Sequence, residues 1–283
     1  MGHKTVLRRR APLDRALTAG RRLLRPGATR KAAQELRRRL EPFGTWMYRF
    51  DLGEGVATPL HQEWLMEVHE TRSRMIFPEL DRRFGNRWRE VRCLDAGCNE
   101  GYFGFLVADR GAQSVLGVDA RESNIQKAEF VKERLGFGNI SFRIDDVMTL
   151  GPERDGTFHL TLALGLLYHL EDPMRALRSL RAVTEELCVI DTQVLRAGPG
   201  VTTACGTKDQ VVETEDVLGV IEEPEWEWNP LASVTGVSLV PNKPALMTML
   251  RHAGFAEVRQ IMPYQNCYEQ YASFDRIVVF ASV

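Results

Sequence analysis

The feature that most constrains the fold is an alternation, from residue 91 onward, of short apolar runs with segments of helical periodicity. Such alternation is typical of a mostly parallel sheet covered by helices on both faces. The expected strands span 91–94, 114–118, 140–144, 159–164, 187–190, 257–261 and 276–280, and the expected helices 102–110, 122–135, 173–184 and 243–253. No helical pattern separates the last two strands. The sequence therefore predicts an α/β fold with a mostly parallel seven-stranded sheet, a C-terminal antiparallel hairpin and an N-terminal helical extension.

Two regions lie outside this alternation. The N-terminal one is divided into a basic helical arm, 1–42, and a section, 43–90, that is expected to cap the substrate side of the main domain, 91–283. The second is an insertion at about 191–242, which is too long for an ordinary connection. Insertions after strand ends commonly build the substrate side of such sheets. In the insertion, Trp226 and Trp228 either wall an apolar substrate pocket or are core aromatics on one side of a strand.

The charge is divided unevenly along the chain. The net charge is -1, but residues 1–42 hold 13 Lys or Arg and three acids, a net +10, so the remainder carries -11. Within the arm, apolar residues at helical spacing predict a basic amphipathic helix with Arg37 to Arg39 largely off its apolar face. These apolar residues are Ala32, Ala33, Leu36 and Leu40. The helix is expected either to meet RNA or an anionic membrane surface, or to pack on the acidic body or stay partly disordered. An organellar targeting peptide is a further alternative.

Composition excludes several other classes of protein. No stretch reaches the eighteen or so apolar residues of a membrane span, and no apolar signal-peptide core follows the basic start, so a cytoplasmic location is expected. The five cysteines are odd in number and lack C-x-x-C spacing, which indicates reduced residues. His61 and His69 have no carboxylate cluster at ligand spacing, so no metal site is expected.

The stretch "LDAGCNEGYFGF" places an acid, Asp95, and three glycines at a break between a strand and a helix. Glycines let the backbone turn tightly and approach a ligand, and the helix start offers unpaired N–H groups. The dinucleotide pattern G-x-G-x-x-G fails, because, counted from Gly97, Asn99 and Tyr102 stand at its second and third glycines. No G-x-x-x-x-G-K-[ST] occurs either. A ligand with ribose and adenine but no pyrophosphate remains.

Further acids follow the next strands. Asp119 closes "VLGVDA", where a carboxylate can accept both ribose hydroxyls. In "SFRIDDV", Asp145 or Asp146 could accept an adenine amino group, with a backbone contact from Val147. Together with the fourth-strand segment "LALGLLYHLEDP", this arrangement resembles the class I S-adenosylmethionine-dependent methyltransferases, which have a Rossmann-like fold, over about residues 91 to 281.

The resemblance implies that the loop around Asp95 holds the methionine end of S-adenosylmethionine, Asp119 the ribose, and Asp146 with Val147 the adenine. The implied cofactor-binding residues are Asp95, Gly97, Cys98, Asn99, Gly101, Asp119, Ala120, Asp146, Val147 and Leu164. The alternative is that Asp95 and Asp119 only cap helices. Near the transferable methyl group, His169 is the candidate base and Tyr168 a candidate hydrogen-bond partner of the acceptor or the cofactor carboxylate. Either side chain can instead satisfy local backbone groups.

Three functions are open at this point. The leading one is methyl transfer to an oxygen or nitrogen of a small-molecule acceptor. "GLLYH" is also similar to the tRNA wobble-uridine carboxymethyltransferases, whose cofactor carries an extra carboxylate; here Arg49 and Arg276 are the candidate cations for it, and the basic arm would be the handle for RNA. A cofactor-binding scaffold without chemistry is the third.

Overall fold

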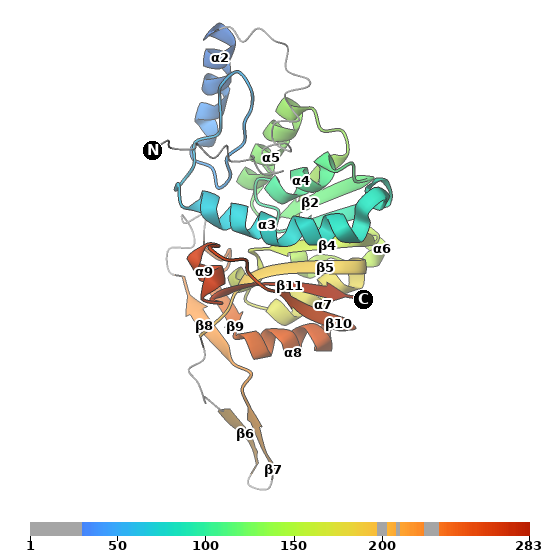
Figure 1. Cartoon of the computed structure of the whole chain (residues 1–283). Coiled ribbons are helices and arrows are strands. Elements are labelled where there is room, and N and C mark those ends of the chain that lie inside the picture. Colours follow the sequence, from blue (N-terminus) through green and yellow to red (C-terminus); the bar gives the residue numbers. More distant parts are fainter. Residues whose placement is uncertain (1–29, 197–202, 208–209, 224–231) are drawn as a thin grey trace, which may run out of the picture.

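The computed structural model describes residues 30–196, 203–207, 210–223 and 232–283, and Figure 1 shows its arrangement. Seven strands form one sheet in the order β10-β11-β5-β4-β1-β2-β3. Their bounds are β1 Arg92–Ala96, β2 Ser114–Asp119, β3 Ile140–Ile144, β4 Phe158–Leu164, β5 Thr184–Gln193, β10 Glu257–Ile261 and β11 Arg276–Ser282. Strands β1 to β5 pair in parallel, and β11 is antiparallel to both β5 and β10. The predicted sheet with its antiparallel C-terminal pair is confirmed.

The main helices follow the predicted periodicity closely. They are α4 Tyr102–Asp109, α5 Glu122–Leu135, α7 Pro173–Val183 and α8 Lys243–Ala253, to which the N-terminal part adds α2 Arg30–Leu40 and α3 Leu65–Phe84. Shorter elements are η2 Glu41–Phe43, η3 Gly85–Glu90, η4 Val147–Thr149, α6 Pro152–Asp155, η5 Leu167–His169 and α9 Glu269–Ala272. Because α9 lies between β10 and β11, the expectation of no helix between the last two strands was wrong by this one turn.

Local sequence explains where the helices begin and end. The Asp172 carboxylate accepts the N–H of Arg175 at the start of α7, and the Asn242 amide oxygen accepts the N–H of Ala245 at the start of α8. A proline in the first turn of each helix has no N–H to leave unpaired. Helix α8 ends at Gly254, whose φ of +103° suits glycine.

Each face of the sheet has its own apolar core, because side chains alternate along buried strands. In β4, Leu160, Leu162 and Leu164 belong to the core that includes α3, α4 and α5, whereas Ala163 faces the core that includes α7 and α8. Figure 1 shows α3 lying across the sheet on one side and α8 on the other. The sheet is therefore buried on both faces, as the continuous apolar runs predict.

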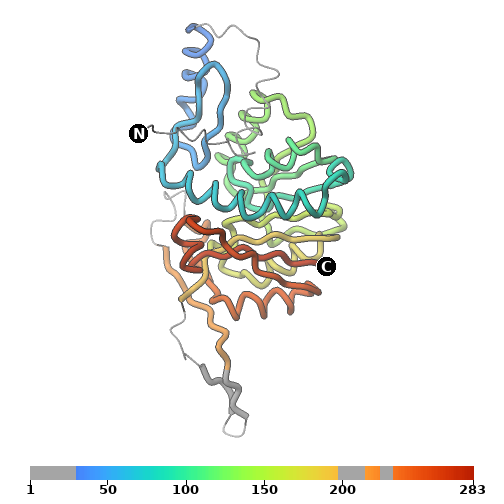
Figure 2. The backbone as a smooth tube through the Cα atoms, viewed as in Figure 1, coloured from blue at the N-terminus to red at the C-terminus, as the bar shows by residue number. Residues whose placement is uncertain are grey.

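The insertion folds into two antiparallel strand pairs. Strands β6 Thr203–Thr207 and β7 Gln210–Thr214 form a hairpin that projects from the body in Figure 1. Strand β8 Leu218–Glu222 pairs with β9 Val237–Pro241, and both are orange in Figure 2. Strand β5 continues to Gln193, so the insertion begins after the predicted residue 191. Trp226 and Trp228 lie outside the described residues. Among the described helices, none is both long and apolar enough to cross a membrane.

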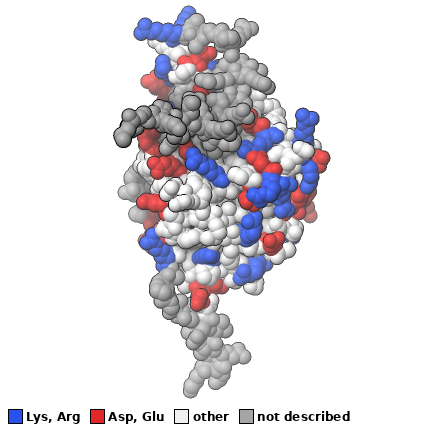
Figure 3. All heavy atoms as spheres, viewed as in Figure 1, with Lys and Arg blue, Asp and Glu red and all other residues white. Residues whose placement is uncertain are grey.

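Helix α2 is the described part of the basic arm; residues 1–29 lie outside the description. Ala33, Leu36 and Leu40 are buried, as the amphipathic pattern predicts, but Ala32 is exposed. Arg39 forms an ion pair with Glu133 of α5 at 3.4 Å. Helix α2 thus packs on the body, and the Lys and Arg side chains at the top of Figure 3 lie where α2 projects.

Candidate functional site

The carboxyl ends of the parallel strands meet at one edge of the sheet. The strand register pairs Asp95 with Gly117, Asp119 with Ile144 and Leu164 with Asp191. The segments that follow β1 to β4 therefore lie along the same edge; they are 97–101, 120–121, 145–149 and 165–170. Ligands of open α/β sheets bind at such an edge.

The first of these segments, residues 97–101, is called the glycine loop below. Gly97 and Gly101 have φ values of +68° and +81°, where other L-residues are strained. A Cβ at Gly97 would lie 2.8 Å from Leu166 Cδ1, and one at Gly101 would lie 2.6 Å from Phe142 Cζ. The N–H of Gly97 donates to the carbonyl of Val118 at 2.8 Å. Glycine is therefore required at Gly97 for the loop to pass close to the segment after β4, and at Gly101 for it to pass close to Phe142 of β3.

Asp95 is buried beneath the loop, with 2% of its surface exposed. Its carboxylate accepts the N–H of Gly104, in the first turn of α4, at 2.9 Å. Burial raises the pKa of Asp95 to about 7, against the opposing effect of this hydrogen bond. The group thus changes its ionisation near neutral pH, where a nearby cation would favour the carboxylate.

Asp119 connects the end of β2 to the glycine loop. Its Oδ1 accepts the N–H of Arg121 at 2.9 Å and Nδ2 of Asn124 at 3.0 Å, and its Oδ2 accepts the N–H of Asn99 at 2.8 Å. Burial raises the pKa of Asp119, although these three donors lower it. Asn99 has a φ of +50°, and its buried Oδ1 has no hydrogen-bond partner within the described residues. Ala120, between Asp119 and Arg121, is exposed.

Cys98 is the remaining predicted residue of the glycine loop. It is buried, its N–H donates to the carbonyl of Val118 at 2.9 Å, and its Sγ lies 3.0 Å from where a Cβ would stand at Gly117. Burial raises the pKa of the thiol well above its usual value. The side chain therefore fills space between the loop and β2, and its backbone is the part that borders the site.

The two acids after β3 differ in their surroundings. Asp145 forms ion pairs with Arg143 at 2.5 Å and Arg154 at 2.7 Å. Although burial raises the pKa of Asp145, hydrogen bonds from Thr149, Arg143 and the N–H of Asp146 hold it below its usual value. Asp146 is exposed and accepts the N–H of Met148 at 2.9 Å, which caps η4. Among the described residues, Asp145 has arginine partners and Asp146 has none, and the neighbouring Val147 is buried.

Tyr168 and His169 stand in η5, directly after β4, with ring centroids 4.1 Å apart. The Tyr168 hydroxyl accepts a hydrogen bond from Arg276 Nη2 at 3.1 Å. Burial, followed by the charges of Arg276 and Arg121, lowers the pKa of His169 to about 4. Its Nδ1 is buried without a partner in the described part of the chain. His169 is therefore a neutral imidazole at neutral pH.

A buried charged cluster beside these residues was missed by the sequence predictions. Asp191 of β5 is fully buried and lies 3.1 Å from Arg72 of α3 and 2.8 Å from Arg276 of β11. The Tyr271 hydroxyl donates to Asp191 at 2.7 Å. Although burial raises the pKa of Asp191, the two arginines and Tyr271 hold it below its usual value. Two guanidinium groups share one carboxylate, so the cluster carries a net charge of +1.

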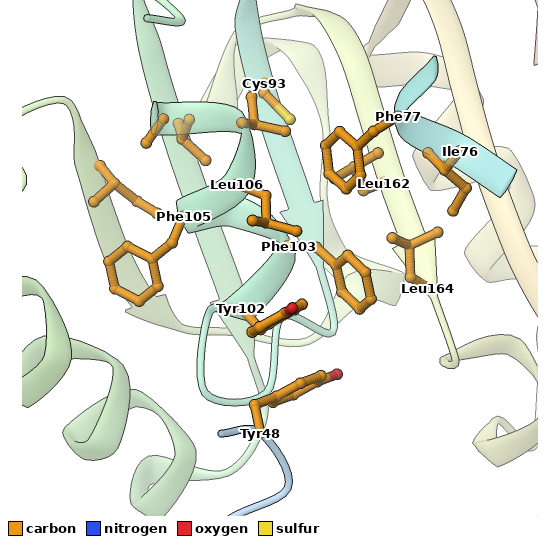
Figure 4. Packing of buried hydrophobic residues seen from close by; sticks show 14 of the residues in the cluster. Tyr48, Ile76, Phe77, Cys93, Tyr102, Phe103, Phe105, Leu106, Leu162 and Leu164 are labelled. Carbon is orange, nitrogen blue, oxygen red and sulfur yellow. The ribbon is translucent and has the colours of Figure 1, made fainter. Parts of the chain in front are cut away.

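Aromatic groups from the N-terminal section pack against the start of α4. The rings of Tyr48 and Tyr102 stack with centroids 4.8 Å apart and an interplanar angle of 6°, and Figure 4 shows both rings directed toward Phe103. His69 packs on Tyr48 at 4.2 Å, and its Nε2 lies 3.1 Å from the carbonyl of Met47. Burial and then the charge of Arg72 lower the pKa of His69 well below its usual value. In the sequence, the indication that His69 and Arg72 lie together was their spacing of three residues, which places them on one face of α3.

Other candidates lie elsewhere. Arg49 is exposed and, with Arg37 and Glu63, lines an open hollow of about 650 Å³. Arg276 is buried in the charged cluster and paired with Asp191, whereas Arg49 is exposed. The structure therefore does not bring together the two candidate cations for an extra carboxylate. Leu164 is buried in the core below the site. No group of three His, Cys, Asp or Glu among the described residues is arranged to hold a metal ion.

Comparison with known proteins agrees with this topology. Residues 89–228 match a family model described as "Methyltransferase domain". The N-terminal domain of EvdMO1, solved with SAH bound, superimposes with a TM-score of 0.66 at 23% identity, covering 92% of this chain and 100% of that domain. A second structure of that domain, with SAH and D-fucose, gives a TM-score of 0.65. At this identity the likeness shows the fold.

Curated relatives share the same region. The tRNA U34 carboxymethyltransferase of Pseudomonas fluorescens (strain Pf0-1) is 30% identical over 173 residues, which cover 59% of this chain and 46% of that protein. The tRNA U34 carboxymethyltransferase of Methylococcus capsulatus is 27% identical over 242 residues, which cover 83% and 62%. The chain thus spans about half to three fifths of the length of these relatives.

Proposed function

We propose that this S-adenosylmethionine-dependent methyltransferase, whose residues 89–228 match a methyltransferase domain, transfers a methyl group to an oxygen or nitrogen of a small-molecule acceptor. The observation that carries the proposal lies in the glycine loop. The N–H of Asn99 donates to Asp119, and the buried amide oxygen of Asn99, Oδ1, has no hydrogen-bond partner among the described residues. A buried acceptor of this kind is costly unless a ligand satisfies it.

The residues present fit the cofactor. Gly97 lets the loop pass against Leu166, whose Cδ1 would lie 2.8 Å from a Cβ at this position, so that the loop backbone could border the methionine end. The raised pKa of Asp95 suits a carboxylate that meets an ammonium group. Asp119 would accept from the ribose, and the exposed Asp146 with Val147 would meet the adenine. When bound, S-adenosylmethionine supplies the methyl group by displacement at its sulfonium.

The acceptor side is formed by Tyr168, His169 and the charged cluster. Arg276 fixes the Tyr168 hydroxyl, which would orient the acceptor. His169 is neutral and would accept a proton only from a strongly acidic or already activated acceptor, because its pKa is about 4. The net positive charge of the cluster favours an acceptor bound as an anion, for which no base is needed. Positioning in a dry site then contributes most of the acceleration.

The test is calorimetric binding of S-adenosylmethionine and SAH to the whole chain. Asp119→Ala removes the acceptor of the ribose hydroxyls, and we expect it to weaken SAH binding by at least about tenfold, since a hydrogen bond to a charged group contributes about 1.5 to 3 kcal/mol. Glu129→Gln on α5, whose partner is Lys132, is the matched control and should bind as the wild type does. Absence of binding to the wild type would refute the proposal.

Mass spectrometry of metabolite acceptors, screened before RNA, then identifies the product. Binding without turnover on any acceptor would instead support a cofactor-binding scaffold.

A second candidate, modification of the tRNA wobble uridine with a carboxylated cofactor, is supported by the names of the relatives and by the Tyr168–Arg276 pair, which could hold a carboxylate. Calorimetry with the carboxylated analogue separates the candidates. A preference for the analogue that disappears in Arg276→Gln would favour tRNA. Salt-sensitive RNA binding that is lost when residues 1–42 are deleted would support it independently.

A further inference from the structure

Glu100 is a charged residue of the glycine loop whose side chain points away from the loop's own backbone and into the N-terminal section. It is fully buried. Its Oε1 and Oε2 accept the N–H of Met47 at 3.1 and 3.0 Å, and Oε2 also accepts the N–H of Tyr48 at 3.1 Å. These two amides lie in residues 46–50, called the cap strap below. A single carboxylate thus holds the strap against the loop.

Lys127 of α5 completes this junction. Its ammonium group lies 3.1 Å from Glu100 Oε1, donates to the carbonyl of Thr45 at 2.6 Å and lies 5.1 Å from the ring centroid of Trp46. The Lys127 side chain is 14% exposed. The buried negative charge of Glu100 is therefore paired with a cation that contacts the same strap, so both halves of the ion pair fasten it.

The strap continues toward the acceptor side. Tyr48, which carries the second of these amides, packs its ring on Tyr102 of α4 and on His69 of α3. His69 is one helical turn from Arg72, which belongs to the charged cluster beside Tyr168. A shift of Glu100 would therefore move the strap, and with it the aromatic groups between the glycine loop and α3.

We propose that Glu100 is a positioning residue that links occupancy of the glycine loop to the placement of the cap strap. The glycine loop carries Asn99 and Gly101 on either side of Glu100, so an ordered loop fixes both the ligand-facing backbone and the carboxylate that holds the strap. The inference rests on the proposed function, because the ligand that orders the loop is S-adenosylmethionine or its product. By linkage, anything that orders the strap also strengthens cofactor binding.

Hydrogen exchange read by mass spectrometry tests the link, with SAH as the probe. In the wild type, SAH should slow exchange of peptides covering 46–50 by at least about tenfold. Glu100→Gln keeps the volume and one acceptor oxygen but loses the charge. It should still bind SAH, more weakly, and SAH should no longer slow exchange in the strap. Glu129→Gln is the control on α5. Lys127→Met leaves the Glu100 carboxylate in place, and in this variant SAH should slow exchange in the strap only partly. It replaces Glu100→Gln as the test if that variant does not fold.

The outcomes separate the two proposals. If the wild type binds no SAH, the proposed function and this inference both fall. If SAH binds and strap exchange slows equally in wild type and Glu100→Gln, the function stands and the linkage is refuted. A purely structural role would raise exchange in the strap and the central strands in both states. It would leave the SAH-dependent difference unchanged, and that outcome also overturns the inference.

Discussion

Asp191 provides the most quantitative test of the site's electrostatics. It is fully buried and shared by Arg72 and Arg276, so Asp191→Asn leaves two buried guanidinium groups with no carboxylate between them. Removing one partner of a buried ion pair destabilises a protein by about 3 to 5 kcal/mol. We expect the free energy of unfolding to fall by that amount near pH 7.

Removing one of the two arginines should lower the free energy of unfolding much less than removing Asp191. Arg72→Met leaves the balanced Asp191–Arg276 pair, and Met fills much of the same volume. The expected loss is roughly 1 to 2 kcal/mol, from hydrogen bonds and from the contact of the guanidinium with the Phe103 ring at 5.3 Å. The order of the two costs follows from the net charge of the cluster, since one substitution raises it and the other removes it.

Urea denaturation followed by tryptophan fluorescence and circular dichroism measures both variants and the double variant. The double variant retains one unpaired arginine and should be less destabilised than the sum of the single costs. The pKa of Asp191 is depressed, so its contribution is present above the unfolded pKa near 4 and is lost as pH falls through the folded value. The difference in the free energy of unfolding between the wild type and Asp191→Asn should therefore become smaller in acid. Equal costs for the two single variants, or additivity in the double, would refute the reasoning.

Three further outcomes are expected. Since the pKa of Asp95 is raised to about 7, its protonated form stabilises the free protein below that pH, and SAH affinity should rise as pH increases from 6 to 7.5; calorimetry across this range should show a flatter profile for Asp95→Asn. Gly101→Ala places a Cβ 2.6 Å from the Phe142 ring at a φ of +81° and should lower Tm by roughly 5 to 15 °C, measured by differential scanning fluorimetry, because αL strain and overpacking each cost about 1 to 3 kcal/mol. If His169 is a base with a pKa of about 4, the methyl-transfer rate should be flat between pH 6 and 8 and should fall in His169→Gln without loss of SAH affinity; an inflection near pH 6.5 would contradict its burial.

The sheet could be predicted because its strands are short apolar runs with turn residues at their ends, and this pattern depends only on neighbouring residues. The end of β5 could not. The apolar run stops at Ile190, yet the strand continues through Asp191 to Gln193. A buried aspartate is tolerated there only because Arg72 and Arg276, far away in sequence, neutralise it.

The glycine loop also combines features that depend on neighbouring residues with features that depend on residues far away in sequence. Its position, its glycines and the place of Asp119 at the end of β2 can be inferred from sequence, because tight turns require glycine and strand ends follow the apolar pattern. The partners of Glu100 cannot, since nothing in "CNEGY" indicates that its carboxylate meets amides some fifty residues earlier. The assignment of each residue to a part of the cofactor stays a prediction until binding is measured.

The bonds between Glu100 and the cap strap also set the boundaries for exchanging parts between related enzymes. A chimaera that takes the N-terminal section, 43–90, from one parent and the main domain from another would separate residues 45–48 from the carboxylate and the lysine that hold them. Recombination should therefore transfer the strap together with Glu100 and Lys127, although Lys127 lies 80 residues beyond Met47. Libraries that cut at residue 90 would assemble a complete fold with a strap that no longer matches its loop.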